Sequence, residues 1–306
     1  MATTNPPHDF PLDRTVPGPR PEASSPQVVT PPPLACDAHC HVFGPADRFP
    51  FSPTRTYTPP DSGITDFELL QERLGLERAV FVQASCHGTD NSAMIDAIQR
   101  GAGRYAGVAM IDDSFTDDDL AYLHENRVRG TRFNFVAHLG GAPDMDTFWR
   151  LVHRVAPLGW HIVLHLDAKD FGTYSSVLDN MPVPYIIDHM ARVPAVDGLD
   201  QEPLQLLLDR MSTDERCWVK ISCAERLTEG RIAPYDDVIP IAQAVVAAAP
   251  DRVLWGTDWP HPNLVDMPDE GALLDLLAEY VPDEALRNQI LVDNPAVLYS
   301  FEDGQP

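Results

Sequence analysis

Residues that can bind a metal or move a proton recur at the ends of short apolar segments of this sequence. His39 and His41 are two positions apart, a spacing that points both imidazoles to one side of a strand. Two imidazoles so placed suit a divalent metal, or paired hydrogen-bond donors to a carbonyl oxygen. Further along, His165, His189 and Asp258 each follow an apolar, β-branched run. Packing in a protein core does not explain polar side chains at the ends of four apolar runs. The pattern therefore indicates that these side chains share one functional site.

Three arginines follow strand-like runs as well, namely Arg132, Arg192 and Arg226. The chain has 22 basic and 46 acidic side chains and a formal net charge of -24, so arginines gathered at one place would form a local positive pocket. A planar guanidinium binds carboxylates in bidentate fashion, which predicts a small anionic substrate. The alternative is that each arginine pairs with a nearby acid such as Glu225 or Asp188.

These side chains need a fold that brings distant strand ends together. Helical stretches separate eight short apolar runs, and strands that alternate with helices predict a parallel sheet. The expected strands span residues 34–42, 78–84, 105–111, 130–135, 161–166, 185–188, 217–221 and 253–256. The clearest helical stretches span residues 67–74, 91–100, 116–126, 146–158, 203–211 and 235–249.

Eight such units favour an α/β fold of the (β/α)8 TIM-barrel class, in which active sites lie at the carboxyl ends of the strands. An open, doubly wound sheet is the alternative. Such a sheet usually carries a glycine-rich phosphate turn after its first strand, and residues 36–41 contain no glycine. The barrel is therefore the preferred prediction.

Composition divides the chain into two parts. Ten of the 30 prolines fall within residues 1–34, which predicts a flexible proline-rich arm. A segment that wraps around a neighbouring subunit is the alternative for this arm. Residues 35–306 have the length typical of one (β/α)8 barrel.

The acidity of the chain argues against nucleic acid or an anionic membrane as a partner. No apolar run approaches the roughly 18 residues that span a bilayer, and the N-terminus lacks the pattern of a signal peptide. Five cysteines form an odd, sparse set that suits a reducing compartment. We expect a cytoplasmic protein whose oligomeric state, a homo-oligomer included, is open.

Several motifs resemble the 2-pyrone-4,6-dicarboxylate lactonases of the amidohydrolase superfamily, in order and from about residue 35 to the end. They span residues 36–45, 83–88, 132–135, 188–190 and 256–263. The resemblance implies a (β/α)8 barrel that hydrolyses a lactone to an open-chain acid in the catabolism of aromatic compounds. It also implies that the substrate is a small anionic lactone.

The resemblance assigns roles to individual residues. Asp258 looks like the general base for water, and His189 like a donor to the developing oxyanion. His39 and His41 would stand beside the scissile carbonyl. The residues expected to bind the substrate are Tyr57, Ser85, Arg132, His138, Arg192 and Arg226.

The sequence departs from the pyrone lactonases at two places. Ala137 and His138 occupy positions where those enzymes have basic residues, and His165 replaces a tyrosine. The pyrone lactonases work without a metal. Related decarboxylases hold one zinc with a strand-one His-x-His, a strand-five histidine and a strand-eight aspartate, and sulfomuconolactone hydrolases also use zinc. His39, His41, His165 and Asp258 recreate that set, which predicts one divalent metal, zinc, with a metal-free site as the alternative.

Other functions fit the same residues. A muconolactone-type or sulfomuconolactone substrate would suit the departures from the pyrone pattern. A metal-dependent decarboxylase or a lactone isomerase would use the same metal and base. A barrel that only binds an anionic metabolite would not require Asp258 together with the strand-end histidines, so a hydrolase is the preferred interpretation.

Overall fold

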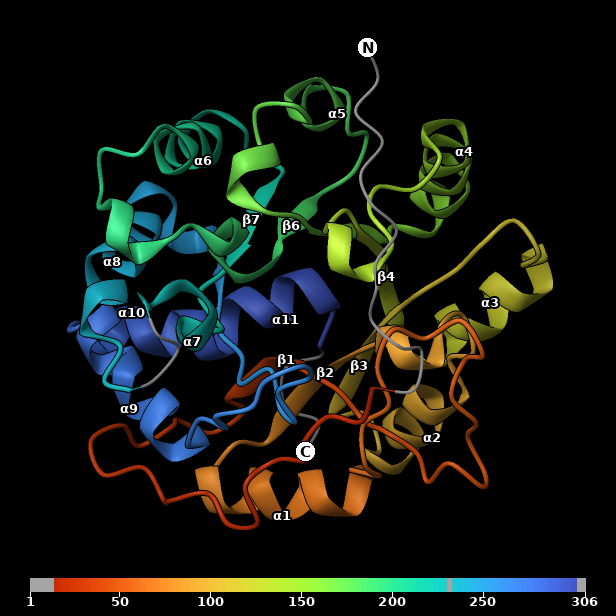
Figure 1. Ribbon diagram of the computed structural model, residues 1–306, viewed down its shortest axis with the longest axis horizontal. Helices are drawn as coiled ribbons and strands as arrows, with labels where there is room; N and C mark the ends of the chain where they lie inside the picture. Colours follow the sequence, from red (N-terminus) through yellow and green to blue (C-terminus); the bar gives the residue numbers. More distant parts are fainter. Residues whose placement is uncertain (1–13, 230–232, 302–306) are drawn as a thin grey trace.

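The computed structural model describes residues 14–229 and 233–301. A single sheet of eight strands in chain order forms its centre (Figure 1), and each strand runs parallel to the next. The strands are β1 (Cys36–Cys40), β2 (Arg78–Val82), β3 (Tyr105–Ala109), β4 (Val128–Asn134), β5 (His161–His165), β6 (Tyr185–Ile187), β7 (Cys217–Lys220) and β8 (Val253–Leu254). Each predicted run contains one of these strands, except that β4 begins two residues before the predicted run of residues 130–135.

Hydrogen bonds between β1 and the segment after β8 close the sheet into a barrel. Ala38 N–H donates to the Trp255 carbonyl at 2.9 Å, and Asp258 N–H donates to the His39 carbonyl at 2.8 Å. Gly256 lies at this seam, where an added Cβ would stand 2.5 Å from the His39 nitrogen. Only glycine permits that approach. The predicted (β/α)8 TIM barrel is confirmed.

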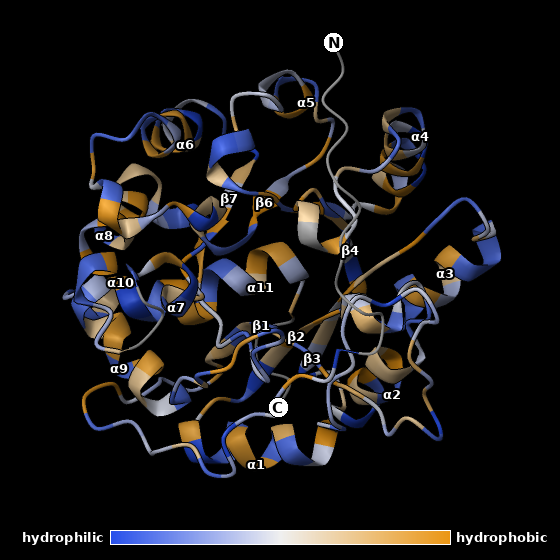
Figure 2. Cartoon of the chain, in the orientation of Figure 1, coloured by the Kyte–Doolittle hydropathy of each residue, from blue (hydrophilic) through white to orange (hydrophobic). Residues whose placement is uncertain are grey.

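Helices surround the strands as an outer ring (Figure 1). Figure 2 shows polar and apolar residues alternating in bands along them, as on α1. The helices are α1 (Ile64–Leu74), α2 (Ser92–Arg100), α3 (Asp117–Glu125), α4 (Met145–Val155), α5 (Ser175–Asp179), α6 (Glu202–Thr213), α7 (Ala224–Leu227), α8 (Ile239–Ala248), α9 (Glu270–Tyr280), α10 (Glu284–Asn288) and α11 (Asn294–Tyr299). The six predicted helical stretches correspond to α1, α2, α3, α4, α6 and α8.

Helix α4 illustrates how the sequence specifies this ring. The side chain of Asp144 accepts a hydrogen bond from the Thr147 N–H and so caps the first turn. The buried residues of the helix recur at the i, i+3, i+4 and i+7 spacing of one helical face. They are Phe148, Leu151, Val152 and Val155. This face packs against the barrel, and polar residues cover the other side.

The C-terminal residues close the amino-terminal end of the barrel. Tyr299 and Phe301 belong to the same buried cluster as inward-facing strand residues such as Val80 and Val163. The Tyr299 ring lies 5.0 Å from the ring of His161, at the start of β5. Access to the barrel interior is therefore confined to the carboxyl ends of the strands, where the predicted site residues lie.

The described part of the N-terminal segment is fastened to the barrel at several points. The N–H of Ser24 donates to Asp269, the residue that caps α9, at 3.0 Å. The N–H groups of Val28 and Val29 donate to Asp275 of α9 at 2.8 and 2.9 Å. Residues 1–13 of the predicted arm lie outside the described residues. Among those described, no helix is both long and apolar enough to cross a membrane.

The packing of α4 generates a stability prediction. Phe148 is fully buried, so Phe148→Ala leaves a cavity and should lower the free energy of unfolding by about 3–5 kcal/mol. The matched control is Leu69→Ala on α1, where the leucine is 63% exposed and the expected change is within about 0.5 kcal/mol. Urea denaturation measures both. Equal losses in the two variants would contradict this account of the packing.

Candidate active site

The carboxyl ends of β1, β5 and β6 and the segment after β8 bring the predicted histidines and Asp258 to one end of the barrel. They surround a small cavity of about 30 Å³. Its lining residues are His41, Tyr57, Ala84, Ser85, Arg132, Leu139, His165, His189, Arg226, Asp258, Pro262 and Asn263. Side chains that are far apart in the sequence thus meet at the barrel mouth, as predicted.

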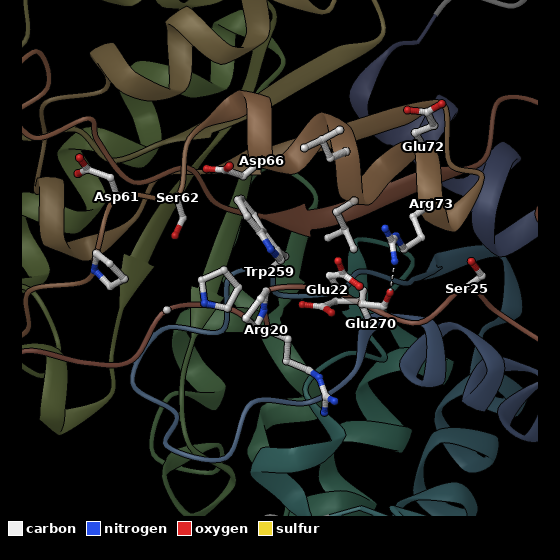
Figure 3. Close-up of a pocket in the computed structure, with 17 residues that line it drawn as sticks. Arg20, Glu22, Ser25, Asp61, Ser62, Asp66, Glu72, Arg73, Trp259 and Glu270 are labelled. Carbon is white, nitrogen blue, oxygen red and sulfur yellow. Dashed lines mark hydrogen bonds between the residues drawn. The ribbon is translucent and has the colours of Figure 1, made fainter.

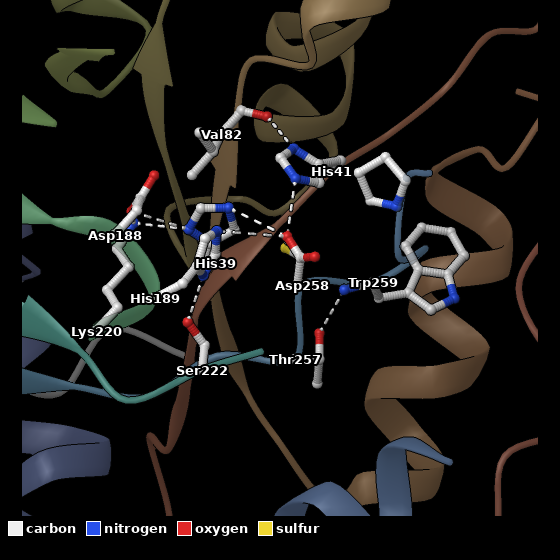
Figure 4. Close-up of polar contacts among 12 residues, drawn as sticks. His39, His41, Val82, Asp188, His189, Lys220, Ser222, Thr257, Asp258 and Trp259 are labelled. Carbon is white, nitrogen blue, oxygen red and sulfur yellow. Dashed lines mark hydrogen bonds and ion pairs between the residues drawn. The ribbon is translucent and has the colours of Figure 1, made fainter. Parts of the chain in front are cut away.

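Asp258 is the centre of this cluster (Figure 4). Its Oδ1 lies 3.3 Å from His41 Nε2, 3.5 Å from His39 Nε2 and 4.0 Å from His189 Nε2. Its Oδ2 accepts a hydrogen bond from Arg226 Nη2 at 2.9 Å. Burial alone would raise the pKa of Asp258, but Arg226, His41 and the other imidazoles outweigh it and hold the pKa well below its usual value. The carboxylate is therefore ionised at neutral pH.

A second buried carboxylate sets the position of Asp258 relative to β1. Thr257 Oγ1 donates to Asp37 Oδ2 at 2.6 Å. The N–H groups of Thr257 and His39 both donate to Asp37 Oδ1 at 3.0 Å. Because Thr257 precedes Asp258, these bonds hold the base candidate and the first histidine at a defined spacing across the barrel seam.

Three buried imidazoles of the site, those of His39, His165 and His189, are neutral. Burial lowers the pKa of His189 to about 3. Burial, reinforced by neighbouring cations, also lowers the pKa values of His39 and His165 well below the usual range. His41 Nδ1 lies 2.7 Å from the Val82 carbonyl, to which it can only donate, and His41 Nε2 is within hydrogen-bond distance of Asp258 Oδ1, at 3.3 Å. Neutral imidazoles can ligate a metal or hydrogen-bond a substrate.

The backbone is strained where β6 ends. His189, Met190, Ala191 and Arg192 all have φ between 51° and 54°, a left-handed turn that costs non-glycine residues roughly 1–2 kcal/mol each. Strain of this kind persists only where the surrounding structure enforces it, and it concentrates at functional sites. Here it turns His189 toward the cavity, where His189 Nδ1 lies 2.8 Å from Ser222 Oγ.

A buried ionic network supports His39 on the side away from Asp258 (Figure 4). Lys220 Nζ donates to His39 Nδ1 at 2.9 Å and lies 3.3 Å from Asp188 Oδ1. Arg132 Nε lies 3.2 Å from the other oxygen, Asp188 Oδ2. Burial would raise the pKa of Asp188, yet Lys220, His39 and Arg132 hold it well below its usual value. Two cations therefore keep this carboxylate charged.

The three predicted arginines each pair with an acid, which was the alternative to a pocket that binds a substrate carboxylate. Arg132 pairs with Asp188, Arg226 with Asp258, and Arg192 Nη1 with Asp167 Oδ1 at 3.1 Å. Arg132 and Arg226 also line the cavity, whereas Arg192 is not among its lining residues. Pairing with an acid and contact with the cavity are thus compatible for two of the three.

The other predicted binding residues separate into two groups. Tyr57 and Ser85 line the cavity. His138 belongs to the short 3-10 helix η2 (Ala137–Leu139), but its side chain lies outside the described residues. Asn134 connects two predicted residues, because its side chain donates to Ser85 Oγ at 3.3 Å and its Oδ1 lies 3.3 Å from His165 Nδ1.

Sequence reasoning missed Lys220. It is the last residue of β7, and it was interpreted as part of the apolar run of residues 217–221. A lysine inside a predicted buried strand was itself a signal, because a lysine is almost never fully buried unless it is paired. In the structure Lys220 is fully buried. Ser222, the partner of His189, was missed for a different reason, since a serine after a strand carries no distinctive pattern.

The residues present fit a metal ion in one respect and not in another. Within the described residues, ligand atoms of His39, His41 and Asp258 lie within 4.8 Å of one another. His39 Nε2 is buried without a hydrogen-bond partner, so this nitrogen is available to a cation when the ring proton lies on Nδ1. His165 is in none of the ligand groups found among these residues, and its ring lies 5.5 Å from that of His189. The structure thus gathers three of the four predicted ligands.

A much larger cavity, of about 950 Å³, lies elsewhere (Figure 3). The N-terminal segment, with Arg20 and Glu22, forms one side, and α1, with Asp66 and Arg73, forms the other. No group of potential metal ligands found in the described residues lies in it as a set. The small cavity holds the reactive side chains, so we take it as the candidate active site.

Comparison with known proteins agrees with this geometry. Residues 36–301 match the amidohydrolase family model. The chain is 44% identical over 273 residues to the 2-pyrone-4,6-dicarboxylate hydrolase of Comamonas testosteroni, covering 87% of this chain and 90% of that protein. It is 42% identical over 286 residues to the 4-sulfomuconolactone hydrolase of Rhizobium radiobacter, covering 92% of this chain and 95% of that protein.

A solved structure shares both fold and sequence. It is a probable 2-pyrone-4,6-dicarboxylic acid hydrolase of Acinetobacter baumannii with citric acid bound, with a TM-score of 0.76 and 26% identity. The match covers 88% of this chain and all (100%) of that one. Fold and site together define a (β/α)8-barrel hydrolase with its reactive cluster at the strand carboxyl ends. The chain belongs to the amidohydrolase family. The predicted family and the predicted enzyme class, a lactone hydrolase, are confirmed.

The neutral histidines generate a prediction about pH. The folded-state pKa of His189, about 3, lies below the unfolded value of about 6.5. The unfolded chain therefore binds more protons below pH 6.5, and stability falls as the pH drops from there toward 3. In His189→Gln the slope of unfolding free energy between pH 6 and 4 should decrease by about 1.4 kcal/mol per pH unit.

The matched control for this experiment is His153→Gln on α4, which replaces an exposed histidine and should leave the slope unchanged. Asp258 and Asp188, whose pKa values are depressed, begin to lose their contributions only as the pH falls toward the unfolded value of about 3.9, and this loss is common to the variants and cancels from the difference in slope. Urea denaturation at several pH values gives the slopes. An unchanged slope in His189→Gln would show that this imidazole is not held neutral by burial.

Proposed function

We propose that the protein hydrolyses the ring of a small carboxylated lactone of the muconolactone or 2-pyrone-4,6-dicarboxylate type, in the catabolism of aromatic compounds. The observation that carries the proposal is the ionised, buried Asp258 among three histidines and Arg226. The names of the two curated relatives, both lactone hydrolases, support the same reaction class.

Asp258 acts as the general base. Its Oδ1 takes a proton from the attacking water and later delivers it to the ring oxygen that leaves. Arg226 holds the other oxygen at 2.9 Å and keeps the carboxylate ionised before substrate arrives. When a substrate carboxylate takes over part of the guanidinium, Arg226 withdraws its charge from Asp258 and the carboxylate becomes a stronger base.

His189 stabilises the oxyanion that forms as water adds to the carbonyl. The Ser222 hydroxyl, 2.8 Å from His189 Nδ1, donates to that nitrogen, so the proton of the neutral ring resides on Nε2. That N–H lies on the Asp258 side of the ring, 4.0 Å from Oδ1, and is free to turn toward the substrate oxygen. A preorganised donor of this kind contributes a large part of the rate enhancement in acyl transfer.

His39, His41 and Asp258 would hold one zinc ion, with His165 as the predicted fourth ligand. When bound, zinc polarises the carbonyl and lowers the pKa of water toward about 7. His41 would ligate through Nε2, because its Nδ1 is bonded to the Val82 carbonyl. His39 presents Nε2 when its Nδ1 donates to Asp188 Oδ1, 3.4 Å away, while Lys220 bonds the same carboxylate.

The substrate carboxylates are held by side chains that line the cavity. Arg132 and Arg226 supply positive charge, and Tyr57 and Ser85 supply hydroxyl groups. We assign Arg192 and His138 the same task at the rim, as the resemblance implies. Orientation by such contacts can supply several kcal/mol of the barrier.

The setting of the reaction follows from composition. All five cysteines are buried and free, which suits a reducing compartment, and we place the enzyme in the cytoplasm. A homo-oligomer stays a prediction, which light scattering on the purified protein would test. The division into an arm of residues 1–34 and a barrel of residues 35–306 also stays a prediction.

The substrate screen tests the reaction itself. The purified protein is offered 2-pyrone-4,6-dicarboxylate, muconolactones and sulfomuconolactones, and ring opening is followed by absorbance and by product mass. Hydrolysis adds one water, a decarboxylase removes carbon dioxide, and an isomerase leaves the mass unchanged. Turnover with addition of water is the expected result, and no turnover of any of these lactones would contradict the proposed function.

Two variants show whether Asp258 carries that activity. Asp258→Asn keeps the shape of the side chain but removes the base, so kcat should fall by about 10²–10⁴-fold. The control is Asp251→Asn, which changes an exposed acid near the start of β8 and should keep full activity. Equal activity in both variants would exclude Asp258 as the base.

Metal content tests the zinc assignment separately. Metal analysis should find about one zinc per chain, and His41→Gln should lose it because one of the three grouped ligands is gone. His165→Gln decides whether the fourth ligand is needed, and His153→Gln is the control that should retain zinc. A metal-free protein with full activity would overturn the zinc assignment while leaving Asp258 as the base.

A further inference from the structure

The first described residues of the chain lie against the loop that carries Tyr57. Thr15 and Thr58 form a parallel β-bridge. Val16 N–H donates to the Thr58 carbonyl at 3.1 Å, and Thr58 N–H donates to the Arg14 carbonyl at 2.8 Å. Both polar backbone groups of Thr58 are thus bonded to the N-terminal segment. These contacts join a remote part of the chain to the rim of the candidate active site.

Val16 also packs behind the wall of the active-site cavity. It is 4% exposed and shares a small buried cluster with Phe43, Tyr57, Ala84 and Cys86. Two members of this cluster, Tyr57 and Ala84, line the cavity itself. Val16 therefore touches the substrate site through Tyr57 and does not reach the reacting groups.

The segment between this contact and the next fastening point does not pack tightly on the barrel. Residues 18–22 line one side of the cavity of about 950 Å³, and α1 lines the other (Figure 3). Pro17, Pro19 and Pro21 keep this stretch extended. The next fastening point is Ala23, whose carbonyl accepts a hydrogen bond from Arg73 of α1 at 2.9 Å, and Ser24, bonded to Asp269, follows it. A short, stiff tether of this kind keeps residues 14–16 at a high effective concentration beside the Tyr57 loop.

The small volume of the active-site cavity indicates a role for the contact between the N-terminal segment and the loop that carries Tyr57. A cavity of about 30 Å³ has room for about one or two water molecules, whereas ligand pockets commonly measure about 300–1,000 Å³. A lactone with its carboxylates needs more room, so part of the rim must move to admit it. The loop that carries Tyr57 is part of this rim. The backbone of its Thr58 is bonded to the N-terminal segment and not to a strand of the barrel.

We propose that residues 14–16 form part of the substrate site, with Val16 as a positioning residue that holds Tyr57 over the cavity. The proposal rests on the proposed function, because it takes Tyr57 as a substrate contact. When the segment detaches, Tyr57 is free to move and the site no longer closes on a carboxylated ligand. Detachment should weaken ligand binding without altering the chemistry around Asp258.

The test compares two buried valines of the same segment in the full-length protein. Val16→Ser removes the apolar contact behind Tyr57. The matched control, Val29→Ser, alters a valine that is 5% exposed and whose N–H bonds to Asp275 of α9, away from Tyr57. Val16→Ile, which keeps an apolar side chain at the same position, should restore wild-type behaviour.

Two measurements are made on each variant. The first is amide hydrogen exchange of the peptide that contains Thr58, which should become faster in Val16→Ser only, because its N–H loses the Arg14 carbonyl. The second is ligand binding, by KM for the lactone that is turned over and by calorimetry with citrate as a tricarboxylate probe. If only one Val16→Ser molecule in ten holds Tyr57 in the binding position, both KM and the citrate Kd rise roughly tenfold while kcat is unchanged.

The outcomes separate this proposal from the proposed function. Unchanged exchange at Thr58 in Val16→Ser overturns the docking of the segment. Faster exchange with unchanged KM and citrate Kd overturns the positioning role. A wild-type protein that turns over no lactone contradicts the proposed function, but a weaker citrate affinity in Val16→Ser would still support the positioning role. A wild-type protein that binds neither citrate nor any lactone overturns both.

Discussion

The site depends on the cost of placing two carboxylates, Asp188 and Asp258, where water hardly reaches them. A buried charge is costly unless opposite charges or hydrogen bonds compensate it, and each carboxylate has cationic partners. Asp258 has Arg226 and Asp188 has Lys220 and Arg132. His39 lies between the two carboxylates, 3.5 Å from one and 3.4 Å from the other. A change in either ion pair therefore alters the charges next to this imidazole.

The backbone at the barrel mouth is distorted to make these pairs possible. Positive φ values occur at His189 and its three successors, and again at Cys223, Asp258 and His261. All of these positions follow β6, β7 or β8, at the end where the reactive groups lie. The regular strands and the covered floor of the barrel supply the rigidity that strained turns require. Fold and site are thus linked, since a looser barrel would let the turns relax and the pairs separate.

Much of this could be predicted from the sequence, and the remainder depends on contacts between distant strands. Alternation of β-branched runs with helical stretches predicted the barrel. A polar residue at the end of a predicted strand was predicted to lie at the barrel mouth. The partner of each side chain could not be predicted, because it depends on strand register and on the irregularity between Asp37 and Cys40 in β1. Lys220 was hidden in an apolar run, and the absence of His165 from the grouped ligands depends on distances between atoms that sequence spacing does not give.

The arrangement around His39 relates the metal-bound and metal-free forms of the site. Lys220 Nζ, at 2.9 Å, can only donate to His39 Nδ1, which leaves the ring proton on Nε2, pointing to Asp258. Asp188, at 3.4 Å, can only accept from the same nitrogen, which leaves a lone pair on Nε2. The first tautomer gives a hydrogen-bond donor beside the base, and the second gives a metal ligand. The position of Lys220 between His39 and Asp188 is therefore linked to the tautomer that His39 adopts.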